Sequence, residues 1–372
     1  MSKTKPVEFQ PIDSKIIKAT PVKSFFVSML TRDINLEDSI LDLLDNCIDG
    51  IHRSKKRTGK FDGNKPYKGF FAEIIISEDF FSISDNCGGI PWDLRDYALR
   101  MGSNQSRQFE SGTLGTYGIG MKRAIFKMGQ HCIISTRSGL FQYKIEISQE
   151  WLDSDNWDLN VEDAVWSGIE DGTSIEIWQL HEAIASQFGE NAEKFISQLK
   201  TTISTHFAYI IEKGFEIKIN GKTVAPRSIM IAYEQTVSAD KPSIRPYIFK
   251  TISEKGVEVF LTVGFWRPPP SESEIEDESK IPKNSSENAG WTILCNDRVV
   301  VFNDKTILTG WGDSGVPRYH NQFIAISGIV EFKSDDPREL PTTTTKRGLE
   351  ANSHLYLQIR QKMCDGLKIF TH

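Results

Sequence analysis

The sequence lacks the features of a secreted, membrane-spanning or disulfide-stapled protein. Its 372 residues include five scattered cysteines without a CxxC pair, so neither a disulfide framework nor a zinc site is expected. No apolar run approaches the length of a membrane span, and the opening stretch MSKTKPVEFQPIDSK has no apolar core of signal-peptide length. These absences predict a cytoplasmic protein with no membrane partner.

An excess of basic residues is also missing. The 44 Lys and Arg against 50 Asp and Glu argue against a surface that coats nucleic acid. A basic loop at 52–68 leaves nucleic-acid binding open, although charge runs are more often simply solvated. The ordinary hydrophobic fraction of 39% and the chain length allow two globular domains.

The hydrophobic pattern predicts helices on one side of an antiparallel sheet, which is an α+β domain. Apolar residues three and four apart predict a helix over 35–53, and helix-like sequence returns at 92–101. Strands are expected on both sides of Glu78–Asp79 and, further along, at 132–137, 141–148 and 173–180.

A second domain is expected over residues 186–372. Helical sequence at 182–212 leads to Asn220–Gly221, a type I′ hairpin signal. Strands should resume at 291–302, and a helix should close the chain. The Pro-, Ser- and acid-rich segment 268–288 is expected to be a mobile loop.

Four short motifs follow one another in the first domain. They are DLLDNCIDG (42–50) on a helix, DNCGGI (85–90) at a strand end, GTYGIGMKRA (115–124) where a glycine-rich loop opens a helix, and GTSIEI (172–177) at a strand start. Each has an ordinary alternative: a solvated helix face, a hairpin turn, a plain helix entry or a plain strand start. Their occurrence together, in this order and at these intervals, favours one ligand site.

In order and wording these motifs resemble the GHKL, or Bergerat-fold, ATP-binding domain. That domain is shared by type II topoisomerases, the large heat-shock chaperone, sensor histidine kinases and MutL. The resemblance covers about residues 25–185 and implies a sandwich of helices on an antiparallel sheet that binds ATP and Mg²⁺. Residues 1–24 would then form an N-terminal arm.

The resemblance implies how adenine is held. Asp85 would accept a hydrogen bond from the exocyclic amine of adenine, which the carbonyl of guanine cannot donate. Gly89 would let the backbone pass close to the ring, and Thr173 would support adenine directly or through a water. Cys87 stands where family sequences commonly have glycine, so the turn must avoid positive φ there or tolerate strain.

The resemblance also assigns the metal and phosphate contacts. Asn46 matches the helix asparagine whose oxygen binds Mg²⁺, and Asp49 on the same helix belongs to the nucleotide site. Lys122 adds charge near the phosphates, unless it is a solvated lysine, and residues 102–118 would be a lid. The resemblance implies a phosphate cradle at the start of a helix, formed by Gly115, Gly118, Ile119, Gly120 and Met121.

One departure from the family concerns catalysis. GHKL ATPases usually carry Glu four residues before the asparagine, as general base for the attacking water. Here that position is Asp42, which is one methylene shorter. Because a general base must reach its water at hydrogen-bond distance, hydrolysis is expected to be slow or to depend on closure. Asp45 is the alternative base, and Asp42 is favoured.

The second domain carries a looser resemblance. The loop LPTTTTKRGLE (340–350) is either an exposed surface loop or similar to the loop of a transducer (ribosomal S5-like) α+β domain. In the subgroup with MutL, MORC and topoisomerase VI, that loop supplies a lysine to the γ-phosphate, which makes Lys346 the candidate. The segments KINGKTVAP (218–226) and LCNDRVVV (294–301) also resemble strands of this domain.

The sequence therefore predicts an ATPase switch that hydrolyses ATP slowly, closes and dimerises with ATP. It would act with a separate effector protein or nucleic acid, as a DNA clamp or in a bacterial defence system. No cleavage, client or nuclease domain is expected after the second domain. Histidine-kinase phosphotransfer is disfavoured because the first histidine, His52, follows Asn46. A nucleotide-binding module without turnover is the alternative.

Overall fold

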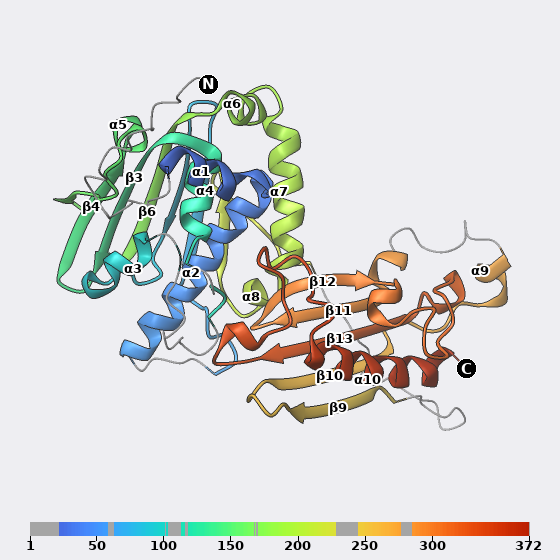
Figure 1. Ribbon diagram of the computed structural model, residues 1–372. Helices are drawn as coiled ribbons and strands as arrows, with labels where there is room; N and C mark the ends of the chain where they lie inside the picture. The colour runs from blue at the N-terminus through green and yellow to red at the C-terminus, as the bar shows by residue number, and fades with distance from the viewer. Residues whose placement is uncertain are drawn as a thin grey trace, which may run out of the picture.

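The structure is a computed structural model with two sheets and the helices beside them (Figure 1), which confirms the α+β class. Residues 1–21 of the predicted arm and 277–284 of the predicted mobile loop lie outside the described residues. The residues described are 22–58, 63–100, 102, 113–115, 118–166, 168, 170–227, 245–276 and 285–371.

The first sheet has eight strands in the order β5-β4-β3-β6-β2-β1-β7-β8. All its neighbours are antiparallel except β1 and β7, which run parallel. The strands are β1 (Phe71–Ile76), β2 (Phe80–Asp85), β3 (Gly129–Ser138), β4 (Phe141–Ile147), β5 (Val161–Asp163), β6 (Gly172–Leu180), β7 (Glu216–Ile219) and β8 (Lys222–Thr223).

Helices cover one face of this sheet (Figure 1). The long helix α2 (Leu36–Thr58) begins where the Asn35 side chain accepts the backbone N–H of Asp38 at 2.7 Å, as an N-cap does. Its apolar side faces the sheet, because Ile40, Leu44 and Ile48 are completely buried. The other helices of this domain are α1 (Lys23–Arg32), α3 (Arg95–Leu99) after the 3₁₀ turn η1 (Trp92–Leu94), α4 (Gly120–Met128), α5 (Gln149–Asp153), α6 (Glu182–Phe188), α7 (Ala192–His206) and α8 (Ala208–Glu212).

The first core continues beyond residue 185, where the sequence placed the domain boundary. Leu199 of α7 is completely buried in this core, which extends to Val224, and β7 pairs with β1. Helical periodicity shows that a segment is amphipathic, but it does not show which sheet its apolar side covers. The hairpin at Asn220–Gly221 is confirmed, with φ of 48° and 73°, and it belongs to the first sheet.

The second sheet has five strands in the order β12-β11-β13-β10-β9, with β11 and β13 parallel. Helix α10 (His354–Thr371) packs its buried side onto this sheet, as the expected closing helix (Figure 1). The identity of this domain as a transducer stays a prediction. The strands are β9 (Tyr247–Ile252), β10 (Glu258–Phe265), β11 (Gly290–Cys295), β12 (Arg298–Asp304) and β13 (Ile326–Lys333); the remaining helical turns are α9 (Glu272–Glu276), η3 (Ser285–Asn288), η4 (Ile307–Thr309), η5 (Asn321–Phe323) and η6 (Pro337–Glu339).

The two domains meet where β12 lies against α7 and α8. His206 at the end of α7 approaches the Val299 carbonyl through Nδ1 at 2.6 Å, and Asp297 accepts hydrogen bonds from Tyr67 and Lys213. This junction brings the loop at 340–350 against α2, where Arg347 pairs with Asp38 at 2.6 Å.

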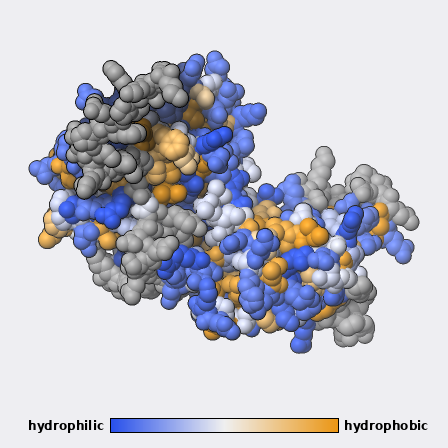
Figure 2. Space-filling model, viewed as in Figure 1, coloured by the Kyte–Doolittle hydropathy of each residue, from blue (hydrophilic) through white to orange (hydrophobic). Residues whose placement is uncertain are grey.

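The visible surface of both domains is mostly hydrophilic, with apolar residues in scattered patches (Figure 2). Within the described part of the chain, no helix combines the length and the apolarity needed to cross a bilayer.

Candidate functional site

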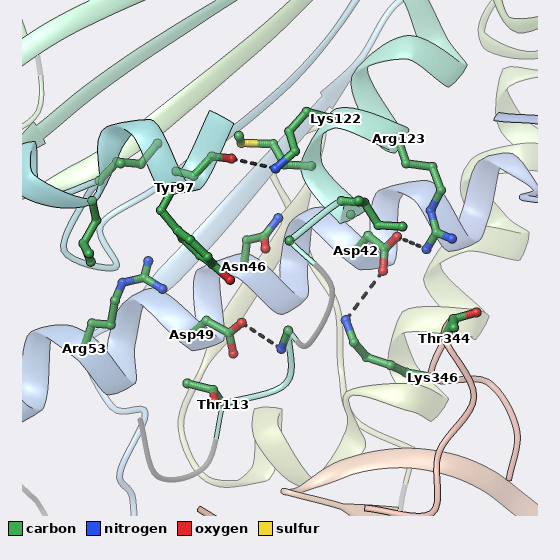
Figure 3. A pocket seen from close by; sticks show the side chains of 18 of the residues that line it. Asp42, Asn46, Asp49, Arg53, Tyr97, Thr113, Lys122, Arg123, Thr344 and Lys346 are labelled. Atoms are coloured by element: carbon green, nitrogen blue, oxygen red, sulfur yellow. Dashed lines mark hydrogen bonds and ion pairs between the residues drawn. The ribbon is translucent and has the colours of Figure 1, made fainter. Parts of the chain in front are cut away.

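A pocket lies where α2, the start of α4 and the segment 90–98 meet, with the loop at 340–350 on one side (Figure 3). It brings together most of the predicted site residues from both domains. Those that line it are Asp42, Asn46, Asp49, Gly115, Gly118, Ile119, Gly120, Met121, Lys122 and Lys346.

Asn46 is one of the polar residues that line this pocket. Every other residue of α2 from Ser39 to Ile51 is buried, whereas Asn46 is exposed and lines the cavity. Its amide makes no hydrogen bond to the described residues, so its oxygen is available to a ligand in the pocket. A hard cation such as Mg²⁺ usually takes one or two protein oxygens and completes its shell with phosphate and water. The chemistry of Asn46 fits such an ion, because its amide oxygen is a hard ligand and the side chain lines the cavity.

Asp49 holds the glycine-rich loop against α2. Its carboxylate accepts the backbone N–H groups of Leu114 at 2.6 Å and of Gly115 at 2.9 Å. A Cβ on Gly115 would lie 2.7 Å from an Asp49 oxygen, so only glycine permits this approach. Burial raises the pKa of Asp49 against the opposing effect of these N–H groups and of Lys346. The role of Asp49 in the described structure is thus to position the loop.

The start of α4 faces the pocket and has the predicted form of a phosphate cradle. Gly118 takes a left-handed φ of 63°, and the helix begins at Gly120. A Cβ at Gly120 would approach the carboxyl carbon of Asp42 to 3.2 Å, so glycine also keeps α4 close to α2 here. The unpaired N–H groups of such a helix start attract anions.

Lys122 is 2% exposed, so the solvated alternative for this lysine is wrong. Its ammonium group donates to the Ala98 carbonyl at 2.7 Å, and burial lowers its pKa to about 8. The side chain lies at the edge of the pocket near Asn46 and Tyr97 (Figure 3). It therefore supplies a desolvated positive charge near the start of α4.

Asp85, Gly89 and Thr173 lie together at strand ends but are not among the lining residues of the pocket. One carboxylate oxygen of Asp85 accepts the N–H of Cys87 at 2.7 Å and that of Thr173 at 3.4 Å. Among the described residues, the other oxygen accepts only from the thiol of Cys47, at 3.5 Å, so it keeps capacity to accept another hydrogen bond. Burial raises the pKa of Asp85 to about 6, although the N–H of Cys87 opposes this.

The turn after Asp85 uses glycine where the backbone demands it. Gly88 and Gly89 take φ values of 97° and 68°, whereas Cys87 is not among the residues with positive φ. The substitution of Cys for the family glycine is therefore accommodated without left-handed strain. A Cβ on Gly89 would lie 2.0 Å from the Arg137 carbonyl, which requires glycine at this contact.

Asp42, Asp45 and Asp49 of α2 are all buried, so the solvated-face alternative is wrong. Asp42 and Asp45 are 3% and 1% exposed. Asp42 lines the pocket, pairs with Arg123 of α4 and has the Lys346 ammonium group 3.6 Å away (Figure 3). Asp45 does not line the pocket and instead pairs with two cations from the second domain.

These two cations are Lys346 and Arg298. The Lys346 ammonium lies 2.8 Å from one oxygen of Asp45, and Arg298 Nε lies 3.0 Å from the other. Burial opposes the charge of Lys346, but the carboxylates of Asp45 and Asp42 outweigh it and raise the lysine pKa. Burial likewise opposes the charge of Asp45, and the two cations outweigh it and lower the pKa of that carboxyl. The pair is thus ionised at neutral pH.

Several pocket residues carry no signal in the sequence. Tyr97 and Leu94 lie between motifs, and Arg53 follows the helix motif. Arg123 stands inside the motif GTYGIGMKRA without a role implied by the resemblance, and its contact with Asp42 makes it part of the site. Pro91 and Ala98 are further lining residues between motifs, whereas Ile90, Thr113 and Thr344 lie within the segments 85–90, 102–118 and 340–350, to which the sequence already points.

Residues 34–165 match the family model described as "Histidine kinase-, DNA gyrase B-, and HSP90-like ATPase". These residues form a GHKL domain. The matched part holds Asn46, Asp85 and the glycine-rich loop, whereas Thr173 and Lys346 lie beyond it. A comparison with curated proteins found no match to the chain. The GHKL match supports ATP as the ligand of this pocket, and the subgroup with MutL, MORC and topoisomerase VI stays a prediction.

Proposed function

We propose that the protein is an ATP-driven switch whose two domains close around Mg²⁺ and ATP in this pocket. The observation that supports this most is the meeting of one exposed amide, Asn46, with a helix start and with Lys122 and Lys346 in one cavity. An oxygen ligand for a metal beside three positive features is what a triphosphate requires.

The proposed placement puts adenine against Asp85, with Gly89 and Thr173 beside the ring. The phosphates then face Lys122 and the start of α4, and Asn46 contributes an oxygen to Mg²⁺. The metal supplies charge neutralisation of the triphosphate when bound. Lys346 is proposed to contact the γ-phosphate, so the second domain would distinguish ATP from ADP.

We propose Asp42 as the general base for water, because it lines the pocket four residues before Asn46. Asp49, the other α2 carboxylate in the lining, is occupied by the N–H groups of Leu114 and Gly115. Arg123 pairs with one carboxylate oxygen of Asp42, and the Asp42 side chain is shorter than the glutamate usual in the family. Both features support slow turnover, because a base must be free and within hydrogen-bond reach of its water. Binding without significant turnover is the second candidate, favoured by the same Asp42–Arg123 contact.

The affinity for ATP should have two pH limbs. The carboxylate of Asp85 must be ionised to accept well from adenine, so affinity should fall about tenfold per pH unit below its pKa of about 6. Lys122 must be protonated to attract phosphate, so affinity should fall about tenfold per unit above its pKa of about 8. Calorimetric titration with ATP from pH 5 to pH 9.5 measures both limbs.

Two variants separate these limbs from protonation of the nucleotide itself, which affects every protein alike. Asp85→Asn should lack the acid limb in its residual binding, and Lys122→Arg should lack the alkaline limb because arginine stays charged. An identical pH profile in the wild type and both variants would contradict the assignment of these two residues.

ATP-dependent dimerisation and action on a separate effector protein or nucleic acid, in a clamp or a defence system, complete the proposal. Phe25 and Met29 on α1 support an association surface, since they are 61% and 58% exposed directly after the N-terminal arm. A shift from monomer to dimer in gel filtration with a non-hydrolysable ATP analogue would support this step, and no shift would contradict it.

A further inference from the structure

The lysine that we assign to the γ-phosphate already has a partner inside the protein. Its ammonium group lies nearer to Asp45, at 2.8 Å, than to Asp42, at 3.6 Å. Lys346 is 9% exposed, so this contact is shielded from water and is stronger than a surface ion pair. A phosphate that recruits Lys346 must therefore compete with Asp45.

The carboxylate of Asp45 would keep a second ion-pair partner if Lys346 moved away. Its other oxygen accepts from Nε of Arg298, which is completely buried and also donates to the His206 carbonyl at 3.0 Å. The Arg298 guanidinium group stacks over the ring of Phe207, 4.2 Å from its centre. Arg298 is thus fixed at the domain junction, and it can keep Asp45 ionised and paired while Lys346 is engaged elsewhere.

The backbone of the loop at 340–350 is strained at Lys346, which is consistent with a fixed position of this side chain. Lys346 has a left-handed φ of 55°, which is unusual for a residue with a Cβ. Its N–H donates to the Thr343 carbonyl at 3.0 Å, which closes a tight turn. Such backbone strain persists where surrounding contacts fix it, and here the contacts with α2 do so.

We propose that Asp45 is a positioning residue that latches Lys346 in the nucleotide-free protein and yields it to the γ-phosphate. Asp45 would thereby set the preference of the site for ATP over ADP. The inference rests on the proposed function and adds a specific competitor for the lysine. Because the binding-competent lysine is only a fraction of the total, the latch lowers the apparent affinity for ATP but not for ADP.

The test is a double-mutant cycle read by calorimetric titration with ATP and with ADP. Asp45→Asn keeps an oxygen for Arg298 but removes the charge that holds Lys346. It should raise the affinity for ATP about tenfold and leave that for ADP unchanged. Lys346→Met should lower the ATP preference, and adding Asp45→Asn to Lys346→Met should change nothing further.

Asp38→Asn is the matched control. Asp38 lies on the same helix and pairs with Arg347, the residue next to Lys346, at 2.6 Å. If Asp45 acted only by holding the loop in place, Asp38→Asn should mimic Asp45→Asn. The latch predicts instead that Asp38→Asn leaves the ratio of the two affinities as in the wild type.

The outcomes separate the latch from the proposed function. No binding of ATP by the wild type overturns the proposed function, whereas ATP binding with a ratio unmoved or lowered by Asp45→Asn overturns the latch alone. Should Asp45→Asn fail to fold, Asp45→Ser, whose hydroxyl can still accept from Arg298, replaces it. If neither variant folds, Asp45 is required for folding, which would contradict the latch.

Discussion

Replacing Asp85 by Asn is expected to weaken ATP binding about 100-fold, the cost of losing a hydrogen bond to a charged group inside a protein. The amide oxygen can still accept the Cys87 N–H, so the turn should survive. Its NH₂ group, however, would face the amine of adenine, donor against donor. Calorimetry with ATP and Mg²⁺ measures the loss, and thermal unfolding checks the fold.

The matched control for this charge change is Asp79→Asn. Asp79 is exposed in the turn between β1 and β2, at the opposite end of β2 from Asp85. The substitution Asp79→Asn removes one carboxylate from the same hairpin and should leave ATP binding unchanged. ATP binding by Asp85→Asn as tight as by the wild type would show that Asp85 does not read the base.

Replacing Asp42 by Asn is expected to lower ATP turnover by about 100-fold or more, which is the usual contribution of a general base. ATP binding should change only a few-fold, since Asn46, Lys122 and the glycine-rich loop are untouched. Steady-state phosphate release and calorimetry on the same preparations measure the two effects separately. Asp42→Glu, which restores the family residue, is expected to raise turnover because the carboxylate reaches further.

The control for Asp42 is Asp38→Asn, one turn earlier on α2, whose carboxylate pairs with Arg347 and does not line the pocket. It should hydrolyse ATP at the wild-type rate. If Asp42→Asn also keeps that rate, Asp42 is not the base. If the wild type binds ATP but has no measurable turnover, the protein is the nucleotide-binding module of the second candidate.

Local patterns were enough to predict the parts of the site that come from short, continuous segments. The helix with Asn46, the strand that ends at Asp85 and the helix that opens after the glycine-rich loop all occur where the motifs place them. In each case a few neighbouring residues set both the backbone and the chemistry. Periodicity then predicts the apolar side of α2, although between Ser39 and Ile51 every residue except Asn46 is buried.

The contacts between the domains could not be predicted in the same way. Arg298 and Asp45 are 253 residues apart, and Lys346 and Asp45 are 301 apart, so no local pattern relates them. The burial of Asp45 depends on these distant cations. Asp42 and Asp49 depend instead on Arg123 and on the N–H groups of the glycine-rich loop, without which such a face would be solvated. The position of β7 beside β1 is another non-local pairing, and it moves the end of the first core to Val224.

The most direct measurement of the central claim is titration of the wild-type protein with a non-hydrolysable ATP analogue and with the matching GTP analogue, with Mg²⁺ and with chelator. If the Asp85 carboxylate recognises the adenine base and Asn46 is a metal ligand, we expect one site per chain and at least a tenfold preference for the adenine nucleotide. Binding should also be weaker without Mg²⁺. Equal binding of both nucleotides, or none of either, would contradict it.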